Sequence, residues 1–530
     1  MAGINDILDA ELALILGLQT HFDLSNQAIV ALFTNVHRTI NHNSVRAIRD
    51  RDPLPYGRRY PAPASQQQCQ EYLDTVSYLD LVPRQRAMAA IMQRRSWRFS
   101  YRFHPVGQGL FSSGQLARQG RPDFVWVYDC GTAHMTKSPP RRTALKAEID
   151  ELVAMTPSTS RRPRLDLATI SHFDEDHVGG FLDLLDKVDI GTLLIPYLTP
   201  WQRLLVVIEQ RADIGSDLFN FLQAPAAFLL ARGEGRIGQI VMVQGVEPGS
   251  LPDGPAVPER GPEPDELEGD DLIFDAAKPP QEDQDDCLGS DAGLFAANVH
   301  TLPPGAAITL NRLWEFVPYN DAALRHLATP GFKQFAQRHV DRLRDPAARP
   351  DSRRYSLRVL IWIYDRRFKT ARAKSISADR RNRISLFLYA GPIGDVQLID
   401  ATETRIGHEL FDWALGPSSL LISENRFGLM MTGDGFLYSR RETTAFIDFF
   451  TPHGRLARAG ILQVMHHGAS RNCRFGLGAM LHPAVSIFSS NPNESPYHPH
   501  KAVLREFAPY CPKQVDRRDG WRVDGYYCYL

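Results

Sequence analysis

Histidines and aspartates are concentrated in residues 171–180, Ser-His-Phe-Asp-Glu-Asp-His-Val-Gly-Gly. His172, Asp174 and Asp176 alternate along the chain, so they can face one side, and His177 follows directly. Carboxylates this close repel one another unless cations lie between them. Neutral imidazole nitrogens and carboxylate oxygens are ligands that suit Zn, Mn or Fe. The residue types and their spacing therefore predict a metal site, in preference to an acidic, solvated loop.

Further candidate ligands lie far downstream, each just after a predicted strand. Asp434, His466 and His498 are separated by equal intervals of 32 residues, which is the length of one strand with its connection. Successive strands of that length can deliver these side chains to one edge of a sheet. His466 and His467 would point to opposite sides of an extended chain, so we expect only one to bind metal. The sequence does not say which.

Short apolar runs bounded by turns predict the strands that carry these residues. The glycine-rich stretch 106–114 predicts the turn of a hairpin, and helices are predicted over 143–155 and 200–233. Alternation of strands with helices predicts an α/β fold class. The runs that we interpret as strands are 97–103, 124–128, 165–170, 191–196, 355–364, 382–389, 428–434, 460–468 and 484–490.

Residues 1–50 have the spacing of apolar residues that is typical of helices, over 6–18, 25–33 and 41–49. The last two helices and the short polar break between them resemble a helix-turn-helix. The second would present polar and basic groups that can meet phosphates or base edges. A helical module that packs on its own chain or on a partner protein is the alternative. The candidate nucleic-acid-binding residues are Asn41, His42, Asn43, Arg46 and Arg49.

Two polar stretches divide the rest of the chain. Residues 51–96 begin with a proline-rich linker over 51–68 and continue with a basic helix over 69–95, before the main domain over 97–530. Within that domain, residues 247–293 are acidic, with 14 Asp and Glu from Asp253 to Asp291 against one Arg and one Lys. Such a composition buries too little apolar surface to order itself, so we predict a disordered insertion.

Composition limits the cellular setting. The formal net charge of the 530 residues is −1, which excludes a global basic surface for nucleic acid but permits a local one. The six cysteines are scattered without a Cys-x-x-Cys pair, which favours reduced thiols over a disulfide framework. The start of the sequence lacks a basic leader, and no apolar run is long enough to span a membrane. We therefore expect a cytoplasmic protein with no membrane partner.

Taken together, the motifs resemble the metallo-β-lactamase fold, and within it the hydrolase domain of ComEC-type DNA-uptake proteins. The resemblance spans roughly residues 97–512 and implies an αββα sandwich. The matching motifs are the 171–180 loop, Asn382 with Ser385, Thr432-Gly-Asp434, His466-His-Gly468, and Asn491 with His498-Pro499.

Three departures from the family are visible. The most common family loop has His where this chain has Asp174, a change that is typical of the ComEC-like branch and of choline-phosphoesterase relatives. The extra carboxylate makes the site richer in oxygen, so Mn or Fe can compete with Zn. The chain also lacks the membrane channel of ComEC, and Ala469 separates Gly468 from Ser470.

The resemblance implies two divalent metal ions, Zn or Mn, held about 3.5–4 Å apart so that they acidify a water and clamp the oxygens of an in-line displacement. It assigns catalysis to Asp176, Asp434 and His467, and implies that Asp129 supports a ligand from outside the coordination sphere. The implied sets are His172, Asp174 and one of His466 and His467 for the first metal, Asp176, His177 and His498 for the second, and Asp434 bridging both.

The first expectation for function is a phosphodiesterase, specifically a nuclease acting on DNA. A hydrolase of a small phosphoester, cyclic nucleotide or lactone is an alternative, because one fold hosts many chemistries. A third expectation is a nucleic-acid- or protein-binding component of a multi-protein system such as bacterial defence.

Overall fold

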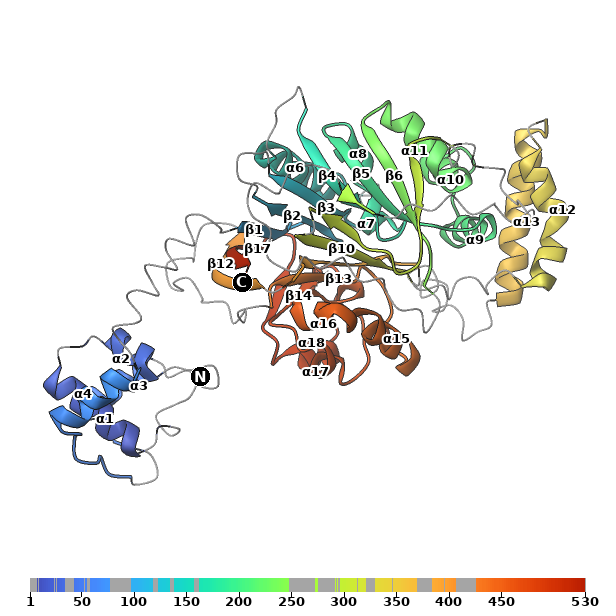
Figure 1. The fold of residues 1–530 in the computed structure, drawn as a ribbon. Helices are drawn as coiled ribbons and strands as arrows, with labels where there is room; N and C mark the ends of the chain where they lie inside the picture. The colour runs from blue at the N-terminus through green and yellow to red at the C-terminus, as the bar shows by residue number, and fades with distance from the viewer. Residues whose placement is uncertain are drawn as a thin grey trace. The chain divides into compact units, whose positions relative to one another are not determined.

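The computed structural model divides the chain into two compact units, Met1–Arg95 and Ser96–Leu530 (Figure 1). Every helix within the described segments is too short or too polar to cross a membrane. The structure describes all residues except 1–6, 8, 23, 25, 34–41, 52, 55–57, 77–96, 118–122, 134–137, 157–161, 247–271, 275–290, 292, 294–295, 312, 321–328, 346, 369–383, 395, 407–425 and 530.

The first unit is helical, as the sequence predicts. Leu16, Ile29 and Val45 come from three different helices and are buried in one apolar core. Cys69 adds the fourth helix to that core, and this helix begins at Gln66, inside the stretch that composition marks as linker. The helices are α1 (Asp9–His21), α2 (Asn26–Phe33), α3 (His42–Arg49) and α4 (Gln66–Val76).

Helix α3 carries the residues that the sequence assigns to nucleic acid. Asn43, Arg46 and Arg49 are exposed on it, while Asn41 lies outside the described residues. Arg46 forms a 3.9 Å ion pair with Asp50, and Arg49 donates to a backbone carbonyl of the loop before α2. The nucleic-acid role of α3 stays a prediction.

The second unit contains two mixed β-sheets, which confirms the α/β class. The nine-stranded sheet has the order β12 (Val396–Ile406), β17 (Gly520–Tyr529), β1 (Trp97–Phe103), β2 (Phe111–Leu116), β3 (Phe124–Cys130), β4 (Arg164–Thr169), β5 (Asp189–Pro196), β6 (Ile237–Val243), β8 (Val299–Leu302). The eight-stranded sheet has the order β16 (Pro512–Val515), β15 (Val485–Ser489), β14 (Ala459–Gln463), β13 (Gly428–Met431), β11 (Phe387–Pro392), β10 (Trp314–Tyr319), β9 (Ile308–Leu310), β7 (Leu272–Ile273).

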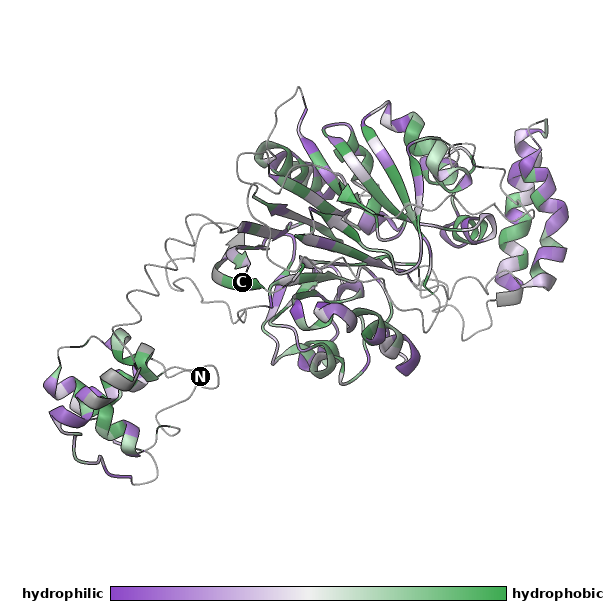
Figure 2. Ribbon diagram, in the orientation of Figure 1, coloured by the Kyte–Doolittle hydropathy of each residue, from purple (hydrophilic) through white to green (hydrophobic). Residues whose placement is uncertain are grey.

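One apolar core lies between the two sheets, and helices cover the outer face of each (Figures 1 and 2). Trp126 of the first sheet and Trp314 of the second meet in it, with ring centroids 6.4 Å apart. The first outer layer holds α6 (Pro139–Met155), α8 (Phe181–Leu185), α9 (Pro200–Gln210), α10 (Asp217–Gln223) and α11 (Pro225–Gly233). Helices α12 (Pro330–Arg344) and α13 (Pro350–Phe368) pack together beside α9 (Figure 1). The second holds α15 (Arg440–Phe450), α16 (Arg455–Arg458), α17 (Leu477–Leu481) and α18 (Lys501–Phe507).

Most predicted strands and helices of this unit are present, but the strand predicted over 355–364 is wrong. These residues lie within α13, a helix of 19 residues. Leu357, Leu360 and Tyr364 are buried at intervals of three and four residues, which is the spacing of one helix face. The contiguous β-branched and aromatic residues 359–363 imitate a buried strand, so the pattern was ambiguous.

Within residues 247–293, for which disorder is predicted, the structure describes only 272–274, 291 and 293, and the prediction is wrong at these positions. The rest of the stretch lies outside the described residues. Leu272–Ile273 form β7 and pair antiparallel with β9. Asp291 is only 1% exposed, and its carboxylate accepts hydrogen bonds from the backbone N–H groups of Ala226, Ala227 and Gly293 at 2.7–3.1 Å. Two of these donors belong to the first turn of α11, so Asp291 caps that helix from a distant segment.

Replacing Asp291 by Ala should destabilise the second unit by about 2–3 kcal/mol, because it leaves buried N–H groups without an acceptor. Urea unfolding followed by tryptophan fluorescence measures this, since all seven tryptophans lie after residue 96. Asp291→Asn keeps one acceptor oxygen and should lose less. Equal midpoints for the wild type and Asp291→Ala would show that the cap has no energetic role.

Candidate metal centre

Asp129, at the end of β3, fixes the loop that follows β4. Its carboxylate accepts the backbone N–H of Ser171 at 2.7 Å and the hydroxyl of Ser171 at 2.6 Å. The same carboxylate accepts the Nδ1–H of His177 at 2.7 Å. All three side chains are buried. The loop that begins with Ser171 is therefore held to the neighbouring strand through one carboxylate.

The glycine-rich turn before β2 packs against this loop. The turn links the antiparallel strands β1 and β2, so a hairpin is present. The predicted turn over 106–114 is too long, because β2 begins at Phe111. The N–H of Leu110 donates to the carbonyl of Asp176 at 2.9 Å. A Cβ on Gly109 would lie 2.5 Å from the carbonyl of Gly131, so only glycine permits this approach. The turn therefore also positions the backbone that carries Asp176.

Four predicted ligands converge at the ends of β4, β13 and β14. Asp176, His177, Asp434 and His467 each offer one ligand atom, and these atoms all lie within 4.8 Å of one another. Nε2 of His177 is 3.0 Å from Oδ1 of Asp434, and Nε2 of His467 is 3.1 Å from Oδ2 of Asp176. The structure thus contains a possible metal-binding cluster formed by segments nearly 300 residues apart.

The carboxylate of Asp434 has imidazoles on both of its oxygens. His177 and His467 approach Oδ1 with Nε2 at 3.0 and 3.6 Å. His466 and His172 approach Oδ2 with Nε2 at 3.4 and 4.0 Å. Both histidines of the pair therefore face the site. The expectation that only one could do so assumed an extended chain, but both have φ in the left-handed region, 46° and 55°.

The same four imidazoles are held by their Nδ1 atoms. In each ring Nδ1 faces an acceptor, which selects the tautomer with a lone pair on Nε2. The hydroxyl of Ser171 can accept because it donates its own proton to Asp129. The pairs are His172 with Ser171 (3.0 Å), His177 with Asp129 (2.7 Å), His466 with Asn472 (2.9 Å) and His467 with the carbonyl of Ser489 (2.5 Å).

His498 lies beside these rings but is held differently. Its ring centroid is 5.5 Å from that of His466 and 6.1 Å from that of His467. Nε2 of Gln108 lies 3.2 Å from its Nδ1, while the side-chain carbonyl of Gln108 accepts the N–H of Asn491. Gln108 therefore donates to Nδ1 of His498, which places the ring proton on Nε2. His498 thus lacks the free Nε2 that its expected role as a ligand of the second metal would require. Burial and the neighbouring imidazoles lower the pKa of His498 to about 4, so this ring is neutral.

Asp174 lies at the start of α7 (Glu175–Val178) and is not one of the four clustered ligands. Its carboxylate accepts a hydrogen bond from Nε2 of Gln210 at 2.7 Å, and the same nitrogen donates to the carbonyl of Phe173 at 3.0 Å. Gln210 thus connects the end of α9 to the metal loop.

Charge in the cluster favours cations. Burial lowers the pKa of His177, but the carboxylates of Asp434 and Asp129 outweigh it and raise that pKa well above its usual value. Burial would raise the pKa of Asp434, but His466 and His177 hold it well below its usual value. Burial and the adjacent His177 lower the pKa of His172 well below its usual value. The carboxylates of Asp434 and Asp129 thus favour a positive charge at His177.

These residues fit a divalent metal. Nε2 of His172 is fully buried and makes no hydrogen bond to any described residue. A buried nitrogen without a hydrogen bond costs free energy, which coordination to a cation would remove. Imidazole nitrogens with oriented Nδ1 groups, together with carboxylate oxygens, form a donor set suited to Zn or Mn.

The sequence-based prediction did not assign a supporting role to three residues. Asn472 is buried and donates to the carbonyls of Asp434 and Gly435 at 2.9 and 3.1 Å. Gln108 lies between the two glycines of the hairpin turn, a pattern that could have indicated a special position. No sequence pattern indicates that the carbonyl of Ser489 accepts a hydrogen bond from His467.

A cavity of about 410 Å³ opens beside the metal loop. Its wall includes Phe173, Val178 and Phe221, and its polar lining includes Gln210 and Asp217. The cavity can hold an apolar group of a small molecule next to the loop.

Substitution of either His466 or His467 by Ala should weaken metal binding at least ~10- to 100-fold, because the loss of a residue that only supports a ligand already has an effect of this size. The reason is that each Nε2 approaches a different oxygen of Asp434. Competition with a chromophoric chelator measures the affinity, and His453→Ala, at an exposed position, is the matched control. Wild-type affinity in either site variant would restrict coordination to the other histidine.

No protein-family model and no curated protein sequence matches this chain.

Proposed function

We propose that this chain is a metal-dependent hydrolase with the αββα fold of the metallo-β-lactamases, resembling the ComEC-like branch, and that it binds two divalent ions, Zn or Mn. Two sheets packed face to face, with helices outside each, support the fold assignment. The order of the motifs along the sequence supports the branch.

The observation that carries the proposal is the position of Asp434. Its two oxygens face two separate groups of imidazoles, His177 with His467 and His172 with His466. A carboxylate flanked in this way can bridge two cations. Asp176, within 3.1 Å of His467, would complete one group. The resemblance assigns Asp174 to the other group, whereas its carboxylate accepts from Gln210 in this structure.

When bound, two divalent cations supply Lewis acidity and lower the pKa of a water that attacks the substrate. The residues of the chain hold and orient the donor set: Asp129 fixes His177, and Asn472 fixes both His466 and the backbone of Asp434. His498 presents an Nε2–H group beside the cluster, so it is suited to donate a hydrogen bond to an oxygen of the substrate.

The substrate class that we propose first is a phosphodiester, within DNA. No Ser or Cys nucleophile is required, since water attacks. A small ester with an apolar group is a second candidate, and the 410 Å³ cavity beside the loop favours it.

The test is a comparison of the purified chain with and without metal. After reconstitution, elemental analysis should find about two transition-metal ions per chain. With Mn²⁺ or Zn²⁺, labelled DNA should be degraded, and EDTA should stop the degradation. Fewer than one bound metal per chain rejects the metal site. Full metal loading with intact DNA, but with hydrolysis of bis-p-nitrophenyl phosphate, supports the small-ester alternative.

A further inference from the structure

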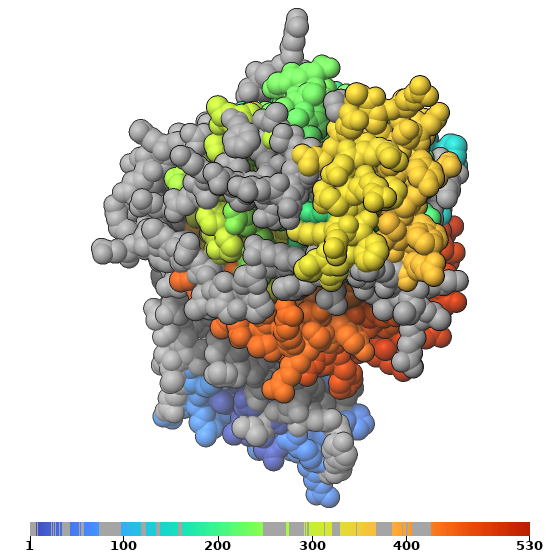
Figure 3. Space-filling view, turned by 90° about the vertical axis from the view of Figure 1, so that its right-hand side faces the viewer, coloured from blue at the N-terminus to red at the C-terminus, as the bar shows by residue number. Residues whose placement is uncertain are grey.

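Helices α12 and α13 form a strongly basic surface in a chain that is nearly neutral overall. Residues 330–366 contain nine Lys and Arg and only four Asp, whereas the whole chain has a net charge of −1. Figure 2 shows that most residues of these helices are hydrophilic, and Figure 3 shows the two helices as a continuous surface on one side of the second unit. The exposed arginines are Arg338, Arg342, Arg344, Arg349, Arg354, Arg358 and Arg366.

The inner side of this helix pair is anchored to the body of the unit. Phe332 is buried and meets Trp201 of α9 edge to face, with ring centroids 6.2 Å apart. Tyr364 is buried as well and packs edge to face on Phe332. Arg211, just after α9, forms a 3.0 Å ion pair with Asp365. The outer side is therefore presented on a fixed support.

Aromatic and basic residues alternate along the outer face of α13. Tyr355, Arg358, Trp362 and Arg366 follow one another at intervals of three, four and four residues, so they share one face. Tyr355 and Trp362 are 59% and 57% exposed. The guanidinium of Arg366 lies 5.2 Å from the ring centroid of Trp362. A stripe of rings and guanidinium groups thus runs along the helix.

The stripe continues onto α12. The rings of His339 and Tyr355 lie 6.4 Å apart, and Phe335, one turn before His339, is 60% exposed. Burial and the guanidinium groups of Arg342 and Arg338 lower the pKa of His339, which agrees with a positive potential here. The outer face of the pair therefore combines positive charge with accessible ring faces.

The chemistry of this face selects among partners. Guanidinium groups bind phosphates of a nucleic-acid backbone, and exposed rings stack on unpaired bases. An acidic polypeptide would satisfy the arginines but would leave Tyr355 and Trp362 without a planar partner. Bases in a duplex are already stacked on each other, so a single strand makes better use of the rings.

We propose that the outer face of α12 and α13 binds single-stranded nucleic acid through its arginines and through stacking on Tyr355 and Trp362. This inference deepens the proposed function, because it names the polymer that the hydrolase engages. Binding is independent of catalysis, so it can be tested with the metal removed.

The experiment measures anisotropy of a fluorescein-labelled 30-nucleotide single strand with the full chain in EDTA, over a series of NaCl concentrations. The triple variant R338Q/R358Q/R366Q should lower affinity at least tenfold at about 100 mM salt. Each lost phosphate contact should reduce the slope of log K against log salt by about 0.7, hence by about 2 for the triple variant. Trp362→Ala should weaken single-strand binding roughly fivefold or more, and duplex binding less.

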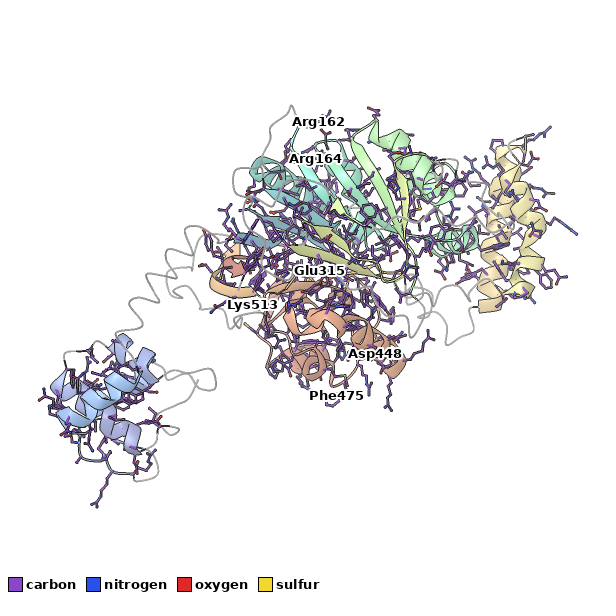
Figure 4. All side chains as sticks on the ribbon, viewed as in Figure 1. Arg162, Arg164, Glu315, Asp448, Phe475 and Lys513 are labelled. Atoms are coloured by element: carbon purple, nitrogen blue, oxygen red, sulfur yellow. The ribbon has the colours of Figure 1, made fainter. Side chains whose placement is uncertain are left out.

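The matched control removes three exposed arginines elsewhere on the same unit. Arg98, Arg142 and Arg164 have side chains 46–67% exposed, and R98Q/R142Q/R164Q should change affinity less than twofold (Arg164 is labelled in Figure 4). A second control, R46Q/R49Q on α3, addresses the surface that the sequence alone predicts. Circular dichroism melting curves should be unchanged in all variants.

Several outcomes would overturn the proposal. Wild-type affinity in R338Q/R358Q/R366Q, or an equal loss in R98Q/R142Q/R164Q, removes the special role of these helices. Loss of binding in R46Q/R49Q alone assigns it to α3 instead. Poly-glutamate that binds as tightly as the oligonucleotide, with the same dependence on Trp362, identifies an acidic polypeptide as the partner. If the chain binds the single strand but holds no metal, this inference stands and the proposed function is rejected.

Discussion

Replacing Asp434 by Asn is expected to reduce DNA hydrolysis at least ~1,000-fold, which corresponds to about 4 kcal/mol of transition-state stabilisation. The amide keeps the shape of the side chain but removes the negative charge that faces four imidazoles. An amide oxygen is also a poor bridge between two cations. The expected metal content therefore falls from about two ions per chain to one or fewer, measured by elemental analysis alongside cleavage of labelled DNA.

The substitution should leave the fold intact. Asn472 holds Asp434 through its backbone carbonyl, which the change does not alter. The matched control is Asp448→Asn, since Asp448 is exposed on α15 (labelled in Figure 4) and should retain full activity and metal content. Undiminished hydrolysis by Asp434→Asn with two bound metals would rule out the bridging role on which the proposed function depends.

The local part of the site could be predicted from the sequence, because it is encoded within a few residues. A β-branched apolar run before the 171–180 loop places that loop at a strand end, and β4 indeed ends at Thr169. The interval of 32 residues from Asp434 to His466 predicts that two strands deliver side chains to one edge, and Asp434 and His467 do lie with Asp176 and His177 in one possible metal-binding cluster. Sequence patterns suffice where strand and ligand are neighbours.

The orientation of His466 and His467 could not be predicted, because it depends on backbone dihedral angles. Left-handed φ values at two consecutive non-glycine residues are rare, and nothing in the local sequence requires them. The hydrogen bonds from His466 to Asn472 and from His467 to the carbonyl of Ser489 hold the pair in this conformation. These partners belong to other segments, so only the tertiary structure reveals them.

The helical conformation of α13 could not be predicted, for a different reason. Residues 359–363, Val-Leu-Ile-Trp-Ile, are contiguous, apolar and mostly β-branched, a composition that favours a strand. Contacts with α12 and α9 bury one helical face of this segment and override its local preference. The wrong prediction of a strand also hid the proposed binding surface. Only a helix places Tyr355, Arg358, Trp362 and Arg366 on one face.

Replacing Arg455 by Met should destabilise the second unit by about 3–5 kcal/mol, because it leaves the carboxylate of Glu315 buried without its partner. Arg455 begins α16 and Glu315 lies in β10, and both side chains are fully buried. Nε and one terminal nitrogen of the guanidinium donate to the two carboxylate oxygens at 3.1 and 2.8 Å. Burial and the carboxylate of Glu315 raise the pKa of the nearby Tyr389 above its usual value.

The ion pair therefore ties the outer helix layer to the eight-stranded sheet at a point where neither charge can reach water (Glu315 is labelled in Figure 4). The double variant R455M/E315L removes both charges and should recover most of the lost stability, since a buried pair can be replaced by apolar side chains at little cost. Urea unfolding followed by tryptophan fluorescence reports on this unit alone, because the first unit contains no tryptophan. If R455M and R455M/E315L unfold at the same urea concentration, the loss arises from packing around Arg455 and not from the unpaired carboxylate.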